Sequence, residues 1–540
     1  MELFMKHILI TSLLAMGLLI QTATAQQPES QQKLLTERIQ RITDRSEFRH
    51  AIFGIEFYSL DTGKPLYTLN AEKLFIPGST TKLLTEGTAL ELLGRDFRFH
   101  TRVYRTGSIT ANGTLEGDLV LVASGDPNLS GRIRDDDTLA FENEDHSYDA
   151  DPATRAVPGD PLLVIRKLAQ QVANAHIKKI RGRVRIDVSL FPEGERELGT
   201  GVVISPVVIN DNLIDVTIGP GPTAGSPVVL QQSPLTSYAT FVNKALTGKS
   251  DSKPDIHWDL DVPSPDGSHT VTVTGSFPAG KPAILYSYAV PVPSRFAQVV
   301  FVEALREKGV QVELGSPGEK TTQAFVVHLG RGRELADSFT PDRVVAEHVS
   351  PRLKEEVKVT LKVSQNLHAS MTPMILEATL PPGDNSKTGF DLERDFLGRA
   401  GLDLTGASQG DGAGGNAHFS PEFMVSYLAF MAKQKDYSDF YNSLPILGRD
   451  GTLFDIQPTS PAAGNVHAKT GTFGVYDPLN RRLLVTAKGL AGYMTTASGQ
   501  HLAFAIYVNN VSVTPESSEV KRIVGQAMGE IAAAAYETVR

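Results

Sequence analysis

"LFIPGSTTKLLTEGTALELLG", residues 74–94, places a serine and a lysine at the start of an apolar-striped helix. Pro77-Gly78 predicts a tight turn directly before that helix. Because Ser79 and Lys82 are three residues apart, they share one helical face and the amine can reach the hydroxyl. The start of a helix also offers free backbone N–H groups and the positive end of the dipole, where an oxyanion can be held. The pair therefore fits a nucleophile and its base, although an N-cap serine beside a surface lysine fits the same letters.

The same Ser-x-x-Lys spacing also occurs at Ser30–Lys33 and Ser250–Lys253, so the pattern alone does not identify a site. A lysine that acts as a base needs its pKa lowered by roughly three units, which burial and a nearby positive charge can achieve. A second lysine that lies beside Lys82 in the fold could supply that charge.

Lys-Thr-Gly occurs twice, at residues 387–389 and 469–471. The first copy lies among turn formers in PPGDNSKTGF, and we expect no catalytic role for it. The second lies in NVHAKTGTFGVY, an alternating strand pattern that precedes a hairpin-like pair over residues 490–509. Only the second copy can therefore form the rim of a cleft beside a sheet.

In such a strand we expect Lys469 to point into the cleft and Gly471 to let a substrate backbone approach. The N–H of Thr472 can then face an oxyanion. His467 shares the strand face of Lys469, and we expect a partly exposed sheet histidine there rather than a substrate contact.

Ser364-Gln365-Asn366 lies between these motifs, where an apolar stretch runs into a helical pattern. Taken alone, it is typical of a polar helix cap. Together with Ser79-x-x-Lys82 and Lys469-Thr470-Gly471, it completes a set of three rare local features, each in a suitable structural context. The combination favours a catalytic cleft built from all three segments.

The start and the composition of the chain limit the class of protein. Residues 1–25 predict a secretory signal peptide, with Lys6, an apolar run over residues 8–20 and Ala23-Thr24-Ala25 as the cleavage signal. The run is shorter than the ~20 residues of a membrane-spanning helix, and no later stretch reaches that length. We expect an exported, periplasmic protein. The absence of cysteine excludes disulfides and thiolate-bound zinc, and the formal net charge of −9 argues against nucleic acid as a partner.

Helix and strand patterns fill residues 26–105 and 346–540. Between them, residues 106–345 hold short β-like runs, which we expect to form an inserted β-rich module of two subdomains. Residues 131–160 of this module carry nine acidic and three basic residues with almost no apolar pattern, which predicts a solvated acidic loop. The glycine and glutamate spacing of a known calcium loop is missing there. The last helical pattern, over residues 517–536, has the apolar face of a helix that covers a sheet.

Ser-x-x-Lys, Ser-x-Asn and Lys-Thr-Gly, in this order, resemble the three signatures of penicillin-binding proteins and serine β-lactamases. The large module, with GDLVLVASGDPNL (117–129), DGAGG (411–415) and LPILGRDGTL (444–453), resembles the class C low-molecular-mass penicillin-binding proteins, the D-alanyl-D-alanine carboxypeptidase/endopeptidase family. The resemblance implies an α/β (α+β) fold, in which helices cover the antiparallel sheet of a transpeptidase-like domain that carries a large insert. It also implies cleavage of peptidoglycan stem peptides without a metal or other cofactor.

The resemblance further implies a role for each residue of the first two motifs. Ser79 is the nucleophile that attacks the penultimate D-alanine carbonyl, and Lys82 takes its proton. Ser364 relays a proton to the leaving amine, and Asn366 holds the substrate amide. β-Lactams are expected to acylate the same serine.

The third motif is implied to bind the end of the substrate. Lys469 binds the terminal carboxylate together with Thr470 and Thr472. Gly471 leaves room for the substrate backbone, and the N–H groups of Ser79 and Thr472 form the oxyanion hole.

Three features depart from the family pattern. Gln365 replaces a common Asp, DGAGG replaces Asp-Gly-Ser-Gly, and VYDPLNRRLL (475–484) follows Lys-Thr-Gly where the family usually turns back. The sequence leaves carboxypeptidase and endopeptidase preference open. It also leaves two alternatives: a β-lactamase, whose tyrosine signature occurs only out of order as Tyr507-Val508-Asn509, and a non-catalytic cell-wall-binding scaffold.

Overall fold

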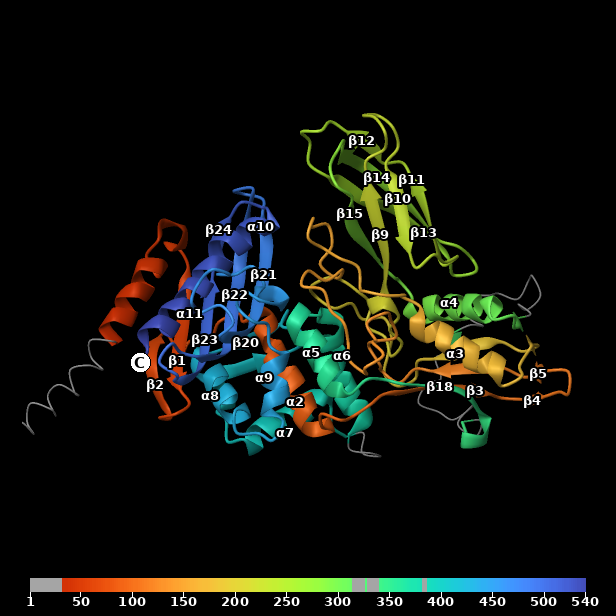
Figure 1. Ribbon diagram of the computed structural model, residues 1–540, viewed down its shortest axis with the longest axis horizontal. Helices are drawn as coiled ribbons and strands as arrows, with labels where there is room; N and C mark the ends of the chain where they lie inside the picture. Colours follow the sequence, from red (N-terminus) through yellow and green to blue (C-terminus); the bar gives the residue numbers. More distant parts are fainter. Residues whose placement is uncertain (1–31, 313–325, 328–338, 381–385) are drawn as a thin grey trace, which may run out of the picture.

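The computed structural model describes residues 32–312, 326–327, 339–380 and 386–540 (Figure 1). The predicted signal peptide and Ser30 lie outside these ranges. Within them, no helix combines the length and the apolar character that crossing a bilayer requires.

One antiparallel sheet joins the beginning and the end of the chain (Figure 1, red and blue). Its strands are β1 (Ile52–Ser59), β2 (Lys64–Leu69), β21 (Val466–Asp477), β22 (Arg482–Thr495), β23 (His501–Asn509) and β24 (Val511–Val513). Their order is β2-β1-β23-β22-β21, and β24 pairs with β22. The expected antiparallel sheet is confirmed, and residues 475–484 lengthen the β21–β22 hairpin.

Helices cover both faces of this sheet. Successive residues of β23 point to opposite faces, and each face is part of a different hydrophobic core. Ala505 and Tyr507 face one core, which α2 and α8 help to build. Phe504 and Ile506 face the other, which the C-terminal helix covers as the sequence predicted. The helical segments are residues 32–43, α2 (Lys82–Leu93), α5 (Leu353–Val363), α6 (Asn366–Thr379), α7 (Gly389–Arg399), α8 (Pro421–Met431), α9 (Tyr437–Ser443), α10 (Ser517–Glu519), the π-helical η8 (Val520–Gly525) and α11 (Gln526–Thr538). A strand pair, β19 (Ala407–Gln409) and β20 (Ala417–Phe419), lies among them.

Among the described residues, the first part of the inserted module contains two sheets and two helices, and its first and last strands extend beyond the predicted bounds of residues 106–345. The strands are β3 (His100–Arg105), β4 (Ser108–Ile109), β5 (Thr114–Glu116), β6 (Leu119–Val122), β7 (Lys179–Ile180), β8 (Val184–Asp187), β16 (Gln311–Val312), β17 (Val326–Val327) and β18 (Val344–Val349). They pair in the orders β17-β8-β6-β3-β18 and β16-β7-β5-β4. The helices α3 (Leu163–Asn174) and α4 (Pro293–Glu307) pack on each other and on these strands. Because β3 and β18 both belong to the larger sheet, the chain enters and leaves the module through neighbouring strands.

A second group of strands forms a separate lobe that projects away from α3 and α4 (Figure 1). Its strands are β9 (Leu213–Gly219), β10 (Val229–Ser233), β11 (Ala239–Asn243), β12 (Leu246–Gly248), β13 (Asp255–Pro263), β14 (His269–Pro278) and β15 (Ile284–Ala289). They form the sheets β10-β9-β15 and β11-β14-β12, with β13 paired to β14.

The acidic stretch over residues 131–160 corrects one sequence-based expectation. It has neither helix nor extended strand, as a loop should, and residues 134–137 are exposed, but residues 131–132, 139–140 and 145–147 are buried rather than solvated. Arg132 and His146 are 0% exposed and Asp145 is 2% exposed. The charge count predicted solvation because it did not show that these groups pair with each other and with distant residues inside the protein.

Candidate active site

The candidate nucleophile, Ser79, lies in a short 3-10 turn, η2 (Gly78–Thr81), that leads directly into α2. Gly78 precedes it with a φ of +55°, which glycine adopts most readily. A Cβ atom at Gly78 would lie only 2.8 Å from the backbone nitrogen of Thr472. The glycine is therefore required both by the turn and by the close approach of the Lys-Thr-Gly strand.

Lys82 lies at the centre of the site and is completely buried. Its Nζ is 2.8 Å from Ser79 Oγ, 2.6 Å from Asn366 Oδ1 and 3.3 Å from Ser364 Oγ. All three of these acceptors are uncharged. Burial lowers the pKa of Lys82 to about 7, although more distant carboxylates oppose the shift. The amine can therefore lose its proton near neutral pH and accept one from Ser79.

The second motif lies between two helices and meets both lysines. Ser364 ends α5 in the left-handed conformation, with φ +64°, and Asn366 begins α6. Lys469 Nζ donates to Ser364 Oγ at 2.7 Å, so this hydroxyl lies between the two amines. Burial, and then the positive charge of Lys82, keeps the pKa of Lys469 well below its ordinary value.

The third motif brings a second backbone segment against the nucleophile. A Cβ atom at Gly471 would lie 2.1 Å from the carbonyl oxygen of Pro77 and 3.0 Å from the nitrogen of Ser79. The backbone nitrogens of Ser79 and Thr472 thus come from two segments that lie side by side. This is the arrangement that an oxyanion hole requires.

Sequence reasoning missed two hydroxyl groups beside the motifs. Tyr148, in the acidic stretch, donates from its hydroxyl to the carbonyl of Ser364 at 2.5 Å and contacts Asn366 Oδ1 at 3.2 Å. Thr452 Oγ1 lies 2.7 Å from Thr470 Oγ1. Thr452 is within LPILGRDGTL, which was the available signal, whereas no local pattern marked Tyr148.

The DGAGG loop packs against the turn that carries the candidate nucleophile, Ser79. Asp411 accepts backbone N–H bonds from Ala413 at 2.8 Å and Gly414 at 2.5 Å. A Cβ atom at Gly414 would lie 2.1 Å from the carbonyl oxygen of Gly78. Small residues are therefore needed here because the loop packs directly on the turn that carries Ser79.

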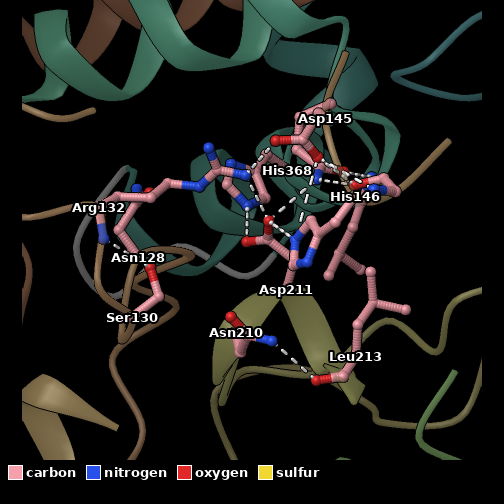
Figure 2. Close-up of polar contacts among 12 residues, drawn as sticks. Asn128, Ser130, Arg132, Asp145, His146, Asn210, Asp211, Leu213 and His368 are labelled. Carbon is pink, nitrogen blue, oxygen red and sulfur yellow. Dashed lines mark hydrogen bonds and ion pairs between the residues drawn. The ribbon is translucent and has the colours of Figure 1, made fainter. Parts of the chain in front are cut away.

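A buried ionic network ties the inserted module to the second motif (Figure 2). Asp211 accepts from Arg132 at 2.6 Å, from His146 at 2.8 Å and from His368 of α6 at 3.0 Å. It belongs to Asn210-Asp211-Asn212, three successive residues with positive φ, a costly backbone shape that its contacts must hold in place.

Gln365 connects this network to the motif residues on either side of it. Its Nε2 donates to Ser147 Oγ at 2.5 Å and to Asp211 Oδ2 at 3.3 Å. An aspartate at position 365 would place a second carboxylate against Asp211, which like-charge repulsion disfavours. The amide at this position is thus explained by its partner in the module.

The ligand atoms of Asp145, His146 and Asp211 lie close enough together to hold a metal ion. Arg132 Nη2, however, lies 2.6 Å from an oxygen of each of the two carboxylates. The guanidinium of Arg132 therefore supplies the positive charge that a metal ion would otherwise supply, which is consistent with a structural ion network.

The remaining sequence-predicted positions lie where a structural role explains them. Lys253 is exposed and pairs with Glu516 at 2.6 Å. Lys387 pairs with Asp395, and its neighbour Thr388 caps α7. His467 stacks on Tyr441 with ring centres 4.1 Å apart, as a half-buried sheet histidine would.

A cleft of about 400 Å³ opens over these groups. Its polar side contains Ser79, Ser364, Thr470 and Thr472. Its apolar side is formed by Leu453, Ile456, Leu483, Val520 and Met528. The cleft thus joins the reactive groups to a surface that can bury part of a substrate.

The fold resembles that of solved penicillin-binding proteins. The crystal structure of penicillin binding protein 4 (dacB) from Haemophilus influenzae matches with a TM-score of 0.69 at 20% identity, over 92% of this chain and 99% of that one. A structure of the same protein, complexed with a β-lactam, matches with a TM-score of 0.68 at 21% identity, over 92% of this chain and 99% of that one. The class of the protein is therefore the penicillin-binding fold with a large insert.

The family model "D-Ala-D-Ala carboxypeptidase 3 (S13) family" matches residues 35–534, and the chain belongs to this family. A D-alanyl-D-alanine carboxypeptidase of Actinomadura sp. is 26% identical over 521 residues, which cover 92% of this chain and 85% of the relative. The carboxypeptidase DacB of Haemophilus influenzae is 25% identical over 474 residues, 84% of each chain. The predicted serine-type D-Ala-D-Ala carboxypeptidase activity is thereby confirmed.

Proposed function

We propose that Ser79 is the nucleophile of a D,D-peptidase that trims peptidoglycan stem peptides. The observation that carries this proposal is the chain of contacts from Ser79 through Lys82 and Ser364 to Lys469. It places a hydroxyl beside an amine with a lowered pKa, and a second hydroxyl where it can pass on a proton.

In the first half of the reaction, Ser79 Oγ attacks the carbonyl carbon of the penultimate D-alanine while Lys82 takes the hydroxyl proton. The oxyanion receives hydrogen bonds from the N–H groups of Ser79 and Thr472. The C–N bond then breaks, and the proton held by Lys82 passes through the hydroxyl of Ser364 to the departing amine. The product amine leaves, and an ester on Ser79 remains.

In the second half, water attacks the ester carbonyl, and Lys82 again accepts the proton and returns it to Ser79 Oγ. Asn366 holds the amide of the bound peptide throughout. Lys469, Thr470 and Thr472 bind the terminal carboxylate, and the substrate backbone lies along β21. The expected role of Gly471 is corrected: its missing side chain leaves room for the turn that carries Ser79 rather than for the substrate. β-Lactams acylate Ser79 by the same steps, but the resulting acyl-enzyme is not hydrolysed at an appreciable rate.

The wider setting of the activity belongs to the same proposal. Residues 1–25 direct export, and the enzyme works in the periplasm. Residues 26–105 and 346–540 form the peptidase domain, and residues 106–345 form the module with its two subdomains. The enzyme acts as carboxypeptidase, endopeptidase or both, since the same D,D bond is cut in each case.

A labelling experiment tests the proposal. The full-length mature protein is incubated with fluorescent penicillin, and we expect a lasting covalent adduct that is lost in Ser79→Ala. Rapid turnover of the label would instead support a β-lactamase. If the wild-type protein is not labelled, or if Ser79→Ala still is, the proposal is wrong.

A second experiment resolves the substrate preference. Purified muropeptides are digested, and the products are separated by chromatography. Loss of monomeric pentapeptides shows carboxypeptidase action, and loss of crosslinked dimers shows endopeptidase action.

A further inference from the structure

A third lysine, Lys488, lies at the rim of the candidate active site. It is on β22, directly opposite Thr472 in the strand register. Its Nζ donates to Thr472 Oγ1 at 2.6 Å. The same side chain lines the cleft that contains Ser79.

The charge of Lys488 is not neutralised by a partner. In the part of the chain that the structure describes, its hydrogen-bond acceptor is the neutral hydroxyl of Thr472, and no carboxylate lies within ion-pair distance. The nearby Lys521 differs, because it pairs with Glu144 at 2.6 Å and Asp455 at 2.8 Å. Burial, and then the charge of Lys521, lowers the pKa of Lys488 to about 8. An anion bound at Lys488 would relieve this unfavourable environment.

The hydrogen bond between the two residues also prepares Thr472 for an anion. A hydroxyl that accepts a hydrogen bond from an ammonium keeps its own proton available as a donor. Lys488 has two further N–H bonds that Thr472 does not use. Together they offer several donors, one of them charged, on the side of the cleft next to β21.

We propose that Lys488 is a specificity-determining residue that binds the terminal carboxylate of the peptide substrate together with Thr472. This inference rests on the proposed function, and it adds a residue that lies outside the three motifs. Lys488 selects peptides with a free C-terminal carboxylate over those whose C-terminus is uncharged.

The test compares two substrates with the same wild-type protein and its variants. The substrates are a stem peptide ending in D-Ala-D-Ala and the same peptide with a C-terminal carboxamide. In Lys488→Gln we expect kcat/KM for the carboxylate substrate to fall roughly 10- to 100-fold, as expected for a lost charged hydrogen bond. We expect the carboxamide substrate to change little, so that the preference for the carboxylate collapses. Lys488→Arg should keep most of this preference because it retains the charge.

Lys433→Gln is the matched control, because it removes an exposed lysine that does not line the cleft and should leave the substrate ratio unchanged. Thermal unfolding of each variant shows whether it is folded. The inference is overturned if Lys488→Gln is folded and keeps the wild-type ratio of the two kcat/KM values. If the wild-type protein cleaves neither substrate and takes up no penicillin, the proposed function itself fails.

The pH dependence gives a second readout. In the wild-type protein the carboxylate preference should decline as the pH rises through about 8, where Lys488 loses its proton. Lys488→Arg should not show this decline, since arginine stays protonated. An identical decline in both proteins would contradict the assignment.

Discussion

Two buried groups of ionisable side chains in this protein differ in whether they contact an oppositely charged partner. In the cleft, Lys82 and Lys469 are fully buried and contact neutral acceptors. In the network of the acidic stretch, Asp211 contacts a guanidinium and two imidazoles. Within the described chain, the cleft lysines therefore have no counter-ion in contact, whereas the charge of Asp211 is neutralised by its partners.

The pKa values follow this difference. Burial lowers the pKa of both cleft lysines, so their neutral forms become accessible. In the network, burial is outweighed, and the charges of Glu356 and Asp211 raise the pKa of His368 to about 10. The pKa of Asp211 is held well below its ordinary value by Arg132 and His368, against the effect of burial. Buried charges without counter-ions become reactive, whereas paired ones become part of the architecture.

The largest expected effect comes from removing Lys82, the proposed base in the cleft. Lys82→Gln should lower the rate of acylation by fluorescent penicillin roughly 10²- to 10⁴-fold, because a general base contributes about this factor. Its thermal stability should not fall, since a buried amine without a counter-ion is lost. Lys253→Gln, in the exposed copy of Ser-x-x-Lys, is the matched control and should react like the wild type. Unchanged acylation in Lys82→Gln would remove the distinction between the two regions.

An equivalent substitution in the ionic network around Asp211 should mainly lower the stability of the protein. Asp211→Asn leaves Arg132, His146 and His368 without their shared carboxylate, and we expect a loss of about 3–5 kcal/mol in the free energy of unfolding. Denaturant unfolding measures this, with Asp136→Asn, at an exposed aspartate of the acidic stretch, as the control. Acylation of the folded fraction should also slow, because Gln365 loses the carboxylate that accepts one of its two hydrogen bonds. A variant as stable as the wild type would show that the network is not architectural.

A smaller effect is expected from pH alone. Because Lys82 must be neutral to act as a base and its pKa is about 7, kcat/KM should rise roughly tenfold between pH 6 and pH 8. The sign is opposite to that expected if the protonated amine were the active form. Steady-state kinetics over this range tests the prediction, and a flat or falling profile would contradict it.

The sequence was sufficient to predict the sheet and the convergence of the motifs. The strand around Lys469, the hairpin that follows it and the C-terminal helix each have a local pattern that survives in the fold. Of the two Lys-Thr-Gly copies, the one in a strand pattern lies in β21 and contacts Ser364, whereas Lys387 of the other pairs with Asp395. The roles assigned to the motif residues stay predictions, which the experiments above address.

The buried part of the acidic stretch could not be predicted in the same way. Tyr148 meets Ser364 and Gln365 meets Asp211 across more than 150 positions of sequence. Neither contact follows from the periods of 2 and 3.6 residues that mark strands and helices. A count of charges does not show which charged residues form pairs. A single sequence shows local patterns well and such distant pairs poorly.

The pairing of β1 with β23 determines when the enzyme can become competent during its synthesis. Phe57 lies opposite Phe504, so the central sheet closes only after more than 440 further residues have been made. Contacts between such distant segments form late and slowly, because a very long loop must close first. The nascent chain therefore contains Ser79 long before β21, the strand that completes the cleft beside it, has been made. If Ser79 is the nucleophile, activity can appear only late in folding.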